Sequence, residues 1–281
     1  MQNDAVRMFP PEKRIHFQEI DSTNNEARRL LNDRTVAELD GTVITAEYQT
    51  AGRGRVEGRQ FYSPSGTGLY TSLILRPTDS LITPDLVTPA AGVAVCRTIE
   101  KLSGRKALIK WVNDVYLDGK KVCGILTEGT LSPEGRIDAL IVGIGVNVRE
   151  PADGFPPELR DIVTAILPAS ETAGAENADM ENTTWGAALT TDSFLSELLV
   201  QLQIVFNADS TDETIGEYQQ RSLVVGKRVT VLAGNESYPA DVLEVTKKCH
   251  LIVRPVDGNG ETASSETKEL LSGEVSLKLK S

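Results

Sequence analysis

The sequence predicts an α+β protein, in which a larger part made of strands and helices precedes a small β-barrel. Three observations lead to this prediction. Apolar segments of strand length follow one another closely between residues 106 and 148. Two longer runs with helical spacing, at 85–102 and about 187–206, are long enough to cover a sheet. From Leu223 onward, short apolar segments alternate with turn residues, which is typical of a small barrel of about 55–60 residues.

The elements of the larger part follow from local patterns. Ser22 or Thr23 can cap a helix that begins near Glu26, because a hydroxyl there accepts from the first backbone N–H groups of the helix. In the helix at 85–102, Pro89 is expected in the first turn after Thr88 as cap, because proline lacks the N–H that later turns need. The predicted strands lie at 15–20, 42–48, 69–75, 106–111, 115–117, 122–126 and 137–148.

Two of these strand predictions carry further information. The segment 69–75 alternates apolar and polar residues, which predicts a strand with one buried face. Asp118-Gly119 separates the strands at 115–117 and 122–126, and this dipeptide is a strong signal for a tight hairpin. A short helix is expected near 212–221.

Changes in composition divide the chain. Residues 1–14 are expected to form an N-terminal arm, 15–222 the larger domain and 223–281 the small C-terminal domain. Within the larger domain, 150–185 is acidic and poor in large apolar residues. We therefore predict that this segment is a surface excursion and partly disordered.

The charge and the rare residues limit the function classes. A net charge of -11 and a pI of about 4.8 lack the basic footprint of a general nucleic-acid or membrane-surface binder. No apolar run reaches the ~18 residues of a membrane-spanning helix, and the N-terminus has no apolar secretion signal. Three distant cysteines predict reduced thiols in the cytoplasm, and two histidines leave little scope for histidine-based metal or triad chemistry.

The segment 52–59 concentrates three arginines and three glycines in eight residues of this acidic chain. Arginine presents a planar fork of donors that matches carboxylate and phosphate, and glycine lets the backbone approach a ligand closely. The segment lacks the Gly-Lys-Ser/Thr ending of a Walker A loop, and its third glycine comes one residue too late for a dinucleotide fingerprint. We expect this Gly/Arg loop to close over an anion, with a solvated hairpin loop as the alternative.

Three further segments combine residues that suit a binding site. The segment 110–114, Lys-Trp-Val-Asn-Asp, runs into the hairpin with Lys121, so an ammonium, a carboxylate and an amide come from consecutive short elements. An ordinary turn with a solvated lysine is the alternative. Gly143 and Gly145 interrupt a strand, which predicts close approach of a ligand or tight packing of a helix. For the segment 21–24, Asp-Ser-Thr-Asn, helix capping is a sufficient explanation.

Taken together, these segments resemble one family, the biotin protein ligases. The matching stretches are DSTN (21–24), YQTAGRGR with the following GR and SP (48–64), KWVNDVYLDGKKVCGILTE (110–128), VGIGVNV (142–148) and, more weakly, GEVSL (273–277). The resemblance implies a fold similar to class II aminoacyl-tRNA synthetases, with a mixed sheet, flanking helices and an SH3-like C-terminal domain. It also implies that ATP and Mg²⁺ activate biotin to biotinyl-5′-AMP, before biotin passes to one lysine of a biotin carboxyl carrier domain.

The resemblance implies roles residue by residue. Lys121 meets the biotin carboxylate and later the ester oxygen of the adenylate, and Arg53 and Arg55 cover the carboxylate and phosphate. Asp114 helps the incoming lysine to lose its proton. The residues implied for biotin are Ser22, Thr23, Asn24, Gln49, Gly52, Arg53, Arg55, Lys121, Gly124, Gly143 and Gly145. Those implied for ATP and the adenylate are Arg55, Arg59, Phe61, Asn113, Asp114 and Asn147. Ligands for Mg²⁺ are not assigned.

Two departures from the family pattern affect the loop. Val56 and Glu57 stand between GRGR and the following GR where the family has one residue, which shifts the register of Arg59. Phe61 stands where the family usually has Trp, so it can stack on a ring but lacks an indole N–H. Because the chain begins almost at the catalytic domain, the resemblance implies a cytoplasmic ligase without the N-terminal winged-helix domain that binds DNA. Pairing into a homodimer through the catalytic sheet is a further option.

The sequence leaves three alternative functions open. A lipoate–protein ligase or octanoyltransferase shares the fold and the acyl-transfer logic, although the combination of the KWxND and GRGR segments favours biotin. A non-catalytic protein could retain the pocket for ligand binding alone. A paralogue of the aminoacyl-tRNA synthetases is disfavoured, because nothing in this acidic chain provides a surface for tRNA.

Overall fold

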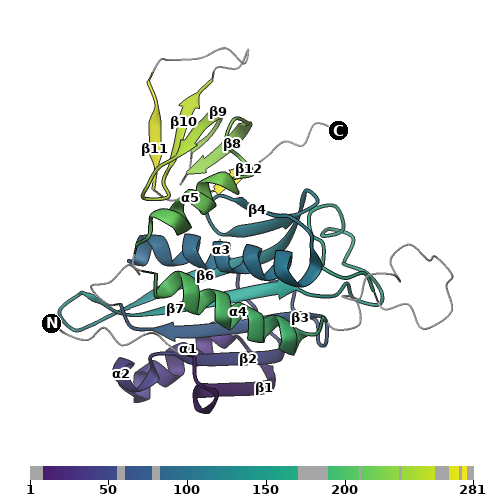
Figure 1. Ribbon diagram of the computed structural model, residues 1–281, viewed down its shortest axis with the longest axis vertical. Coiled ribbons are helices and arrows are strands. Elements are labelled where there is room, and N and C mark those ends of the chain that lie inside the picture. The colour runs from purple at the N-terminus through teal and green to yellow at the C-terminus, as the bar shows by residue number, and fades with distance from the viewer. Residues whose placement is uncertain are drawn as a thin grey trace.

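In the residues that the structure describes, seven strands form the central sheet of the larger domain (Figure 1). The computed structural model describes residues 9–55, 61–77, 83–169, 189–208, 210–233, 236–256, 266–271 and 274–276. The strands are β1 (Arg14–Ile20), β2 (Thr42–Gln49), β3 (Gly68–Leu75), β4 (Ala107–Lys110), β5 (Asp114–Leu117), β6 (Lys120–Leu131) and β7 (Ile137–Asn147). Their order is β1-β2-β3-β7-β6-β5-β4, with β1 and β2 parallel and the other neighbours antiparallel. The prediction of a mixed sheet is confirmed.

Helices cover both faces of this sheet (Figure 1). They are α1 (Thr23–Asp33), α2 (Val36–Leu39), α3 (Pro84–Ser103), α4 (Thr191–Phe206) and α5 (Asp212–Gln220). Successive residues of β7 point to opposite faces, so Val142 and Ile144 join the large core with α3 and α4, while Ile141 joins a small cluster with α1 and α2. The same alternation turns Gly143 and Gly145 toward the α1 face. None of the helices in the described ranges is long and apolar enough to cross a membrane.

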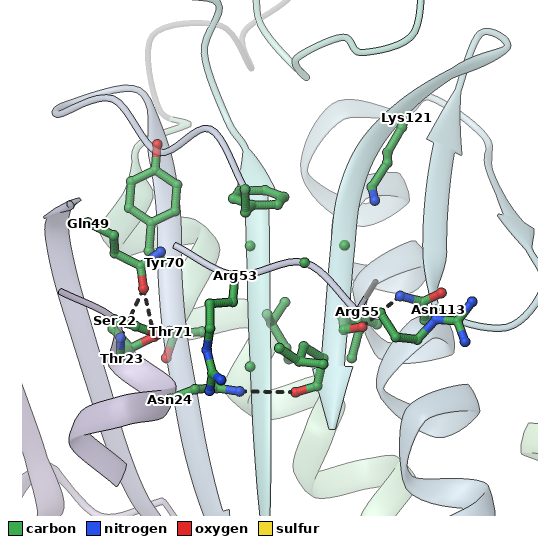
Figure 2. A pocket seen from close by; sticks show the side chains of 18 residues that line it. Ser22, Thr23, Asn24, Gln49, Arg53, Arg55, Tyr70, Thr71, Asn113 and Lys121 are labelled. Atoms are coloured by element: carbon green, nitrogen blue, oxygen red, sulfur yellow. Dashed lines mark hydrogen bonds between the residues drawn. The ribbon is translucent and has the colours of Figure 1, made fainter. Parts of the chain in front are cut away.

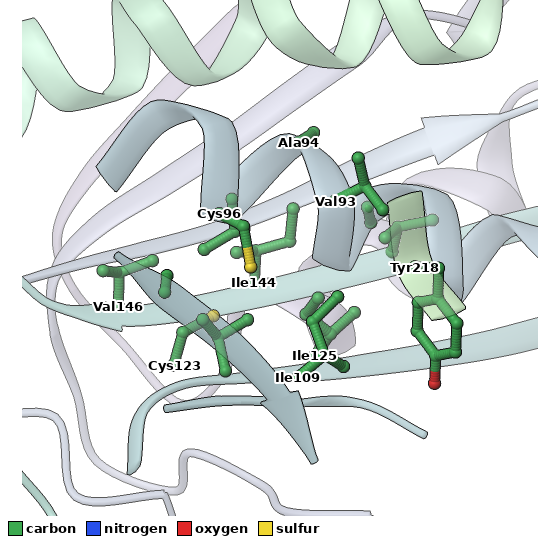
Figure 3. Close-up of a cluster of buried hydrophobic side chains, with 14 of the residues drawn as sticks. Val93, Ala94, Cys96, Ile109, Cys123, Ile125, Ile144, Val146 and Tyr218 are labelled. Carbon is green, nitrogen blue, oxygen red and sulfur yellow. The ribbon is translucent and has the colours of Figure 1, made fainter. Parts of the chain in front are cut away.

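The core between α3 and the sheet contains two of the three cysteines (Figure 3). Cys96 from α3 and Cys123 from β6 are fully buried, and Cys249 is buried near the C-terminal sheet; all three are free thiols. Burial raises the pKa of the Cys96 and Cys123 thiols, because a thiolate is poorly solvated among apolar side chains. The prediction that the cysteines form no disulfide framework is therefore confirmed.

The structure corrects the start of α3 and the pattern of β3. Helix α3 begins at Pro84 after Thr83, so Pro84 occupies the first turn and Pro89 lies inside the helix. Thr88 does not cap the helix; its hydroxyl donates to Thr127 Oγ1 at 2.7 Å. Every residue of β3 is buried, instead of alternate residues. The reason is that β3 lies third in the sheet, with packed layers on both faces.

The hairpin between β5 and β6 follows the sequence prediction. Asp118 and Gly119 both have positive φ, at 49° and 82°, which suits a tight turn between antiparallel strands. Lys121 therefore lies close to the start of β6, where the register pairs it with Tyr116 of β5.

Residues 150–169 pack on the sheet more closely than the prediction of a surface excursion implies. The N–H of Lys121 donates to Ile162 O at 2.9 Å, and the N–H of Ile166 donates to Asn147 O at 3.1 Å. Phe155 and Ile166 are buried. This part of the segment thus packs against β6 and β7 through backbone hydrogen bonds. Residues 170–185 lie outside the described residues.

The C-terminal part forms a second, antiparallel sheet (Figure 1). Within the described ranges its order is β11-β10-β9-β8-β12, from β8 (Arg228–Ala233), β9 (Glu236–Val245), β10 (Leu251–Pro255), β11 (Lys268–Leu270) and β12 (Glu274–Ser276). Strand β11 is not in the sequence prediction. Closure into an SH3-like barrel stays a prediction.

The two sheets meet at the turn that connects β4 to β5. Trp111 donates its indole N–H to Cys249 O at 2.8 Å, which links the turn to the segment between β9 and β10. Tyr218 of α5 donates to Val112 O in the same turn at 3.1 Å. Backbone bonds join Ile109 of β4 to the connection that leads into β8. The turn is therefore held from the side of the C-terminal sheet.

Candidate active site

The floor of a cavity on the α1 face is made largely of backbone. Gly143 and Gly145 of β7 pair with Leu126 and Gly124 of β6, so three glycines lie next to one another on two strands. A Cβ added to Gly143 would lie 2.3 Å from Asn24 Oδ1, and one added to Gly145 would lie 2.7 Å from the Phe61 ring. Side chains at these positions would fill the cavity, so the glycines keep about 500 Å³ of space open, including its mouth.

Uncharged polar groups form one end of this cavity (Figure 2). Gln49 Oε1 accepts from the backbone N–H of Thr23 at 2.9 Å and from the Thr23 hydroxyl at 3.2 Å. Ser72 donates to Asn24 Oδ1 at 2.5 Å, and it also lies 2.7 Å from Thr23 Oγ1. These side chains are largely buried, so their donors and acceptors are held in fixed directions.

Ser22 shows why capping is not a sufficient explanation for the segment 21–24. It occupies the N-cap position of α1 with extended backbone, but its side chain makes no capping hydrogen bond. Ser22 instead lines the cavity, where it is 3% exposed. Asp21 points elsewhere, since its carboxylate pairs with Arg29 at 2.7 Å; the hydrogen bond from Arg29 holds the pKa of Asp21 well below its usual range.

The described part of the Gly/Arg loop crosses the cavity (Figure 2). Arg53 points toward Asn24, whereas Arg55 points toward Asn113 on the opposite side. Arg53 Nη2 lies 3.1 Å from Glu128 Oε2, which ties the loop to β6. Both arginines line the cavity, so the prediction of a loop that brings positive charge to a site agrees with their placement.

Phe61 separates this cavity from a larger neighbour. Its ring packs edge-on against Tyr70, with ring centroids 6.3 Å apart, and it lines both cavities. Burial raises the pKa of the Tyr70 phenol, so Tyr70 stays protonated and donates to Pro64 O at 2.8 Å. Phe61 thus lies between the two cavities, and Tyr70 packs against it on the side of the first.

Lys121 stands at the junction of the two cavities. Its Nζ lies 2.7 Å from Asp114 Oδ1, in an ion pair that is mostly shielded from solvent. The second cavity, of about 1570 Å³, is lined by Asp114 and Asn147 together with Lys110 and Lys227. A ligand with two parts could therefore span both cavities past Lys121.

Most of the predicted site residues line the first cavity. They are Ser22, Thr23, Asn24, Gln49, Arg53, Arg55, Phe61, Asn113, Lys121, Gly124, Gly143 and Gly145. Asp114 and Asn147 line the second cavity instead. Gly52 lines neither cavity. A Cβ added to it would lie 2.7 Å from Ser63 Oγ. Arg59 and the extra residue at Val56-Glu57 lie outside the described residues.

The structure adds residues that the sequence prediction missed. The cavity is also lined by Gly54, Tyr70, Thr71, Ile125, Leu126 and Ile144. Tyr70 and Ser72 of β3 stand directly opposite Gly145 and Gly143 of β7. Only the pairing of β3 with β7 reveals this, because β3 by itself reads as an ordinary core strand. Glu128 was missed as well, although it ends the segment that carries the resemblance.

In the described part of the chain, no group of three or more His, Cys, Asp or Glu side chains has the spacing of a metal site. Mg²⁺ commonly binds through one or two carboxylates, water and substrate phosphates, without an all-protein cage. The described carboxylates nearest to Lys121 and Arg53, Asp114 and Glu128, already pair with these cations.

A comparison with family models identifies the larger domain. Residues 16–147 match the model described as the Biotin/lipoate A/B protein ligase family. This segment of the chain is therefore similar to members of that family. The match runs from β1 to β7, and so it includes all the residues that line the first cavity.

Relatives with assigned names agree with this result. The chain is 43% identical over 156 residues to a Bifunctional ligase/repressor BirA of Bacillus spizizenii, covering 56% of this chain and 46% of the relative. It is 40% identical over 131 residues to a Biotin--[acetyl-CoA-carboxylase] ligase of Paracoccus denitrificans, covering 46% of this chain and 51% of that protein. The chain thus matches about half the length of these relatives.

The overall fold is similar to a solved ligase. The structure of a biotin protein ligase from Aquifex aeolicus in complex with biotin and ATP superimposes with a TM-score of 0.68 at 28% identity. This similarity covers 94% of the present chain and 97% of the other, so it includes the C-terminal sheet.

Proposed function

We propose that this protein is a biotin protein ligase, which activates biotin with ATP and then transfers it to a lysine of a biotin carboxyl carrier domain. The observation that carries the proposal is the polarity of the first cavity. Uncharged groups gather around Thr23 and Gln49, glycine backbone forms the floor, and Arg55 and Lys121 stand at the other end. Biotin has the matching order of a neutral ureido ring, an apolar body and a carboxylate.

In the first step, a carboxylate oxygen of biotin attacks the α-phosphorus of ATP, and pyrophosphate leaves. Both reactants are anionic, so they repel each other. Arg55 and Lys121 offset this repulsion, because fixed cations stabilise the charge that builds up in the transition state. The product, biotinyl-5′-AMP, keeps its acyl phosphate beside Lys121, where water is partly excluded.

In the second step, the amine of the carrier lysine attacks the acyl carbon of the adenylate. An amide bond forms, the bond from carbon to the phosphate oxygen breaks, and AMP leaves. The attacking nitrogen must lose a proton, and we assign Asp114 as the group that accepts it. The ion pair with Lys121 keeps this carboxylate at the junction of the two cavities.

The second cavity is our candidate for the nucleotide. It lies past Phe61, it contains Asp114 and Asn147, and Lys110 and Lys227 add positive charge for phosphates. When bound, Mg²⁺ would neutralise phosphate charge, with its ligands drawn mainly from phosphate oxygens and water.

Pyrophosphate exchange tests the proposal directly. The purified protein should exchange labelled pyrophosphate into ATP when biotin is present, and it should attach biotin to a carrier domain. Lipoate in place of biotin is the matched comparison, because the family also includes lipoate ligases. Exchange that depends on lipoate and not on biotin would replace this proposal with the lipoate one. Tight biotin binding without exchange would favour a non-catalytic role.

A further inference from the structure

Glu128 on β6 accepts hydrogen bonds from three residues, and two of them, Asn24 and Arg53, line the first cavity. Its Oε2 accepts from Asn24 Nδ2 at 2.8 Å. Arg53 Nη2 lies 3.2 Å from Oε1 and 3.1 Å from Oε2, and Arg28 of α1 donates to Oε1. The glutamate side chain is 18% exposed, so these bonds are better shielded than those of a surface ion pair.

The bond to Glu128 leaves Arg53 able to bind a ligand. A guanidinium has five N–H donors, and Glu128 engages those of one terminal nitrogen. Arg53 lines the cavity at the same time. One side chain can therefore hold Glu128 and present its other edge to an anion. Because two arginines share one carboxylate, the group keeps a net positive charge.

The bond to Glu128 also sets the direction of the Asn24 amide. Since Nδ2 donates to the carboxylate, Oδ1 is turned toward Ser72 and toward the floor at Gly143. Leu126 O accepts from the same Nδ2 at the longer distance of 3.4 Å, so Glu128 is the closer of two acceptors that hold this orientation. Glu128 thereby makes Asn24 an acceptor in the part of the cavity that holds uncharged groups.

We propose that Glu128 is a positioning residue for biotin, which fixes the Arg53 guanidinium for the carboxylate and the Asn24 amide for the ring. The inference rests on the proposed function, since biotin is the ligand in question. Glu128 itself does not line the cavity. It acts through two residues that do, one on the Gly/Arg loop and one on α1.

Direct binding of biotin in the absence of ATP tests this role. Glu128→Gln keeps the size of the side chain and an acceptor for Asn24, but it removes the charge that holds Arg53. The dissociation constant for biotin, measured by calorimetry, should rise about tenfold, which is typical when a hydrogen bond to a charged group is lost. The KM for ATP should stay unchanged, and Glu128→Asp should recover part of the affinity.

Glu217→Gln is the matched control. Glu217 also accepts from two arginines, Arg97 and Arg221, and its side chain is 20% exposed, but it lies on α5 away from both cavities. This variant should bind biotin as the unmodified protein does. A loss of affinity as large as that of Glu128→Gln would show a general loss of stability and would overturn the inference.

A double-mutant cycle with Arg53 separates positioning from general structure. If Glu128 acts mainly through Arg53, Glu128→Gln should weaken biotin binding much less in an Arg53→Gln background. Equal weakening in both backgrounds, or tighter binding in Glu128→Gln alone, would overturn the role of Glu128. Failure of the unmodified protein to bind biotin would instead overturn the proposed function.

Discussion

In two clusters of this protein one glutamate pairs with two arginines, but the clusters lie on different kinds of elements. The framework cluster is Arg97, Glu217 and Arg221, and the site cluster is Arg28, Glu128 and Arg53. In the framework cluster, Arg97 belongs to α3, Glu217 belongs to α5 and Arg221 follows the last residue of α5. The side chains of Arg97 and Arg221 are 21% and 13% exposed. In the site cluster, one arginine belongs to a loop, and both arginine side chains are 39% exposed.

The same kind of ion pair has different effects in these two settings. Between helices that already pack against each other, a shared carboxylate adds stability and little else. Beside a cavity, it decides where a cation stands and which way an amide points. The first role is measured by unfolding and the second by ligand binding, so each prediction below compares a change near the cavity with a matched change in the framework.

The largest effect is expected for Lys121→Ala. Removing a cation that acts on the transition state should lower biotin-dependent pyrophosphate exchange by about 100-fold or more. Lys101→Ala is the matched control, because Lys101 also lies 2.7 Å from a glutamate, Glu197, but on helices of the framework. Near-normal exchange in Lys121→Ala, with the fold confirmed by circular dichroism, would contradict the proposed chemistry.

Gly143→Ala should come next. The added Cβ would lie 2.3 Å from Asn24 Oδ1, so the amide that bonds to Ser72 and Glu128 would have to move. Biotin affinity should fall by about 10- to 100-fold, as one or two hydrogen bonds to the ring are misplaced. Calorimetry measures this, and unchanged affinity would mean that the glycine floor is not the binding surface.

Glu217→Gln should change stability and leave biotin binding intact. Removing hydrogen bonds to charged groups at this partly shielded site should cost about 1–2 kcal/mol in the free energy of unfolding. Chemical denaturation measures the loss. A variant as stable as the unmodified protein would show that the framework cluster contributes nothing.

The same glutamate predicts a pH dependence. Burial raises the pKa of Glu217, but the hydrogen bonds from Arg97 and Arg221 outweigh it, so the pKa is lower than its usual 4.5. A carboxylate with a lowered pKa stabilises the fold above the usual value, and this contribution is lost as the pH falls further. The stability difference between the unmodified protein and Glu217→Gln should therefore be constant near neutral pH and shrink below pH 4.5.

The smallest effect is expected for Gly216→Ala in α5. No atom lies within 4 Å of the added Cβ, and Gly216 is inside a helix. Alanine should raise the free energy of unfolding by about 0.5–1 kcal/mol, because it restricts the unfolded chain more than glycine does. With Gly143→Ala, it forms a pair of identical substitutions, of which only Gly143→Ala should weaken ligand binding.

The fold was predictable where local pattern decides the outcome. The hairpin at Asp118-Gly119 follows from turn chemistry, whereas the mixed sheet was implied by the family resemblance. The full burial of β3 did not follow, because it depends on a position in the middle of the sheet that a single strand does not encode. Likewise, Thr83-Pro84 and Thr88-Pro89 are both plausible helix starts, and only packing distinguishes them.

The site was predictable where its residues stand in motifs. Lys121 and the paired glycines lie in segments that carry the resemblance, and the structure brings them to one cavity. Glu128 was not predicted as a site residue, because its partners lie far away in sequence: Arg28 is 100 positions distant and Arg53 is 75. From the sequence alone, a glutamate on a strand is expected to be solvated. Only the folded structure places Arg28 and Arg53 beside Glu128.

The indole bond from Trp111 to Cys249 has a consequence for how the two domains respond to ligand. Trp111 stands in the turn that leads into Asn113 and Asp114. Packing of the C-terminal sheet against this turn and the conformation of the turn are therefore linked equilibria. Linkage is reciprocal. A ligand that favours the docked turn should slow amide hydrogen exchange in β9 and β10, and a substitution that loosens the small sheet should weaken the ligand by the same factor.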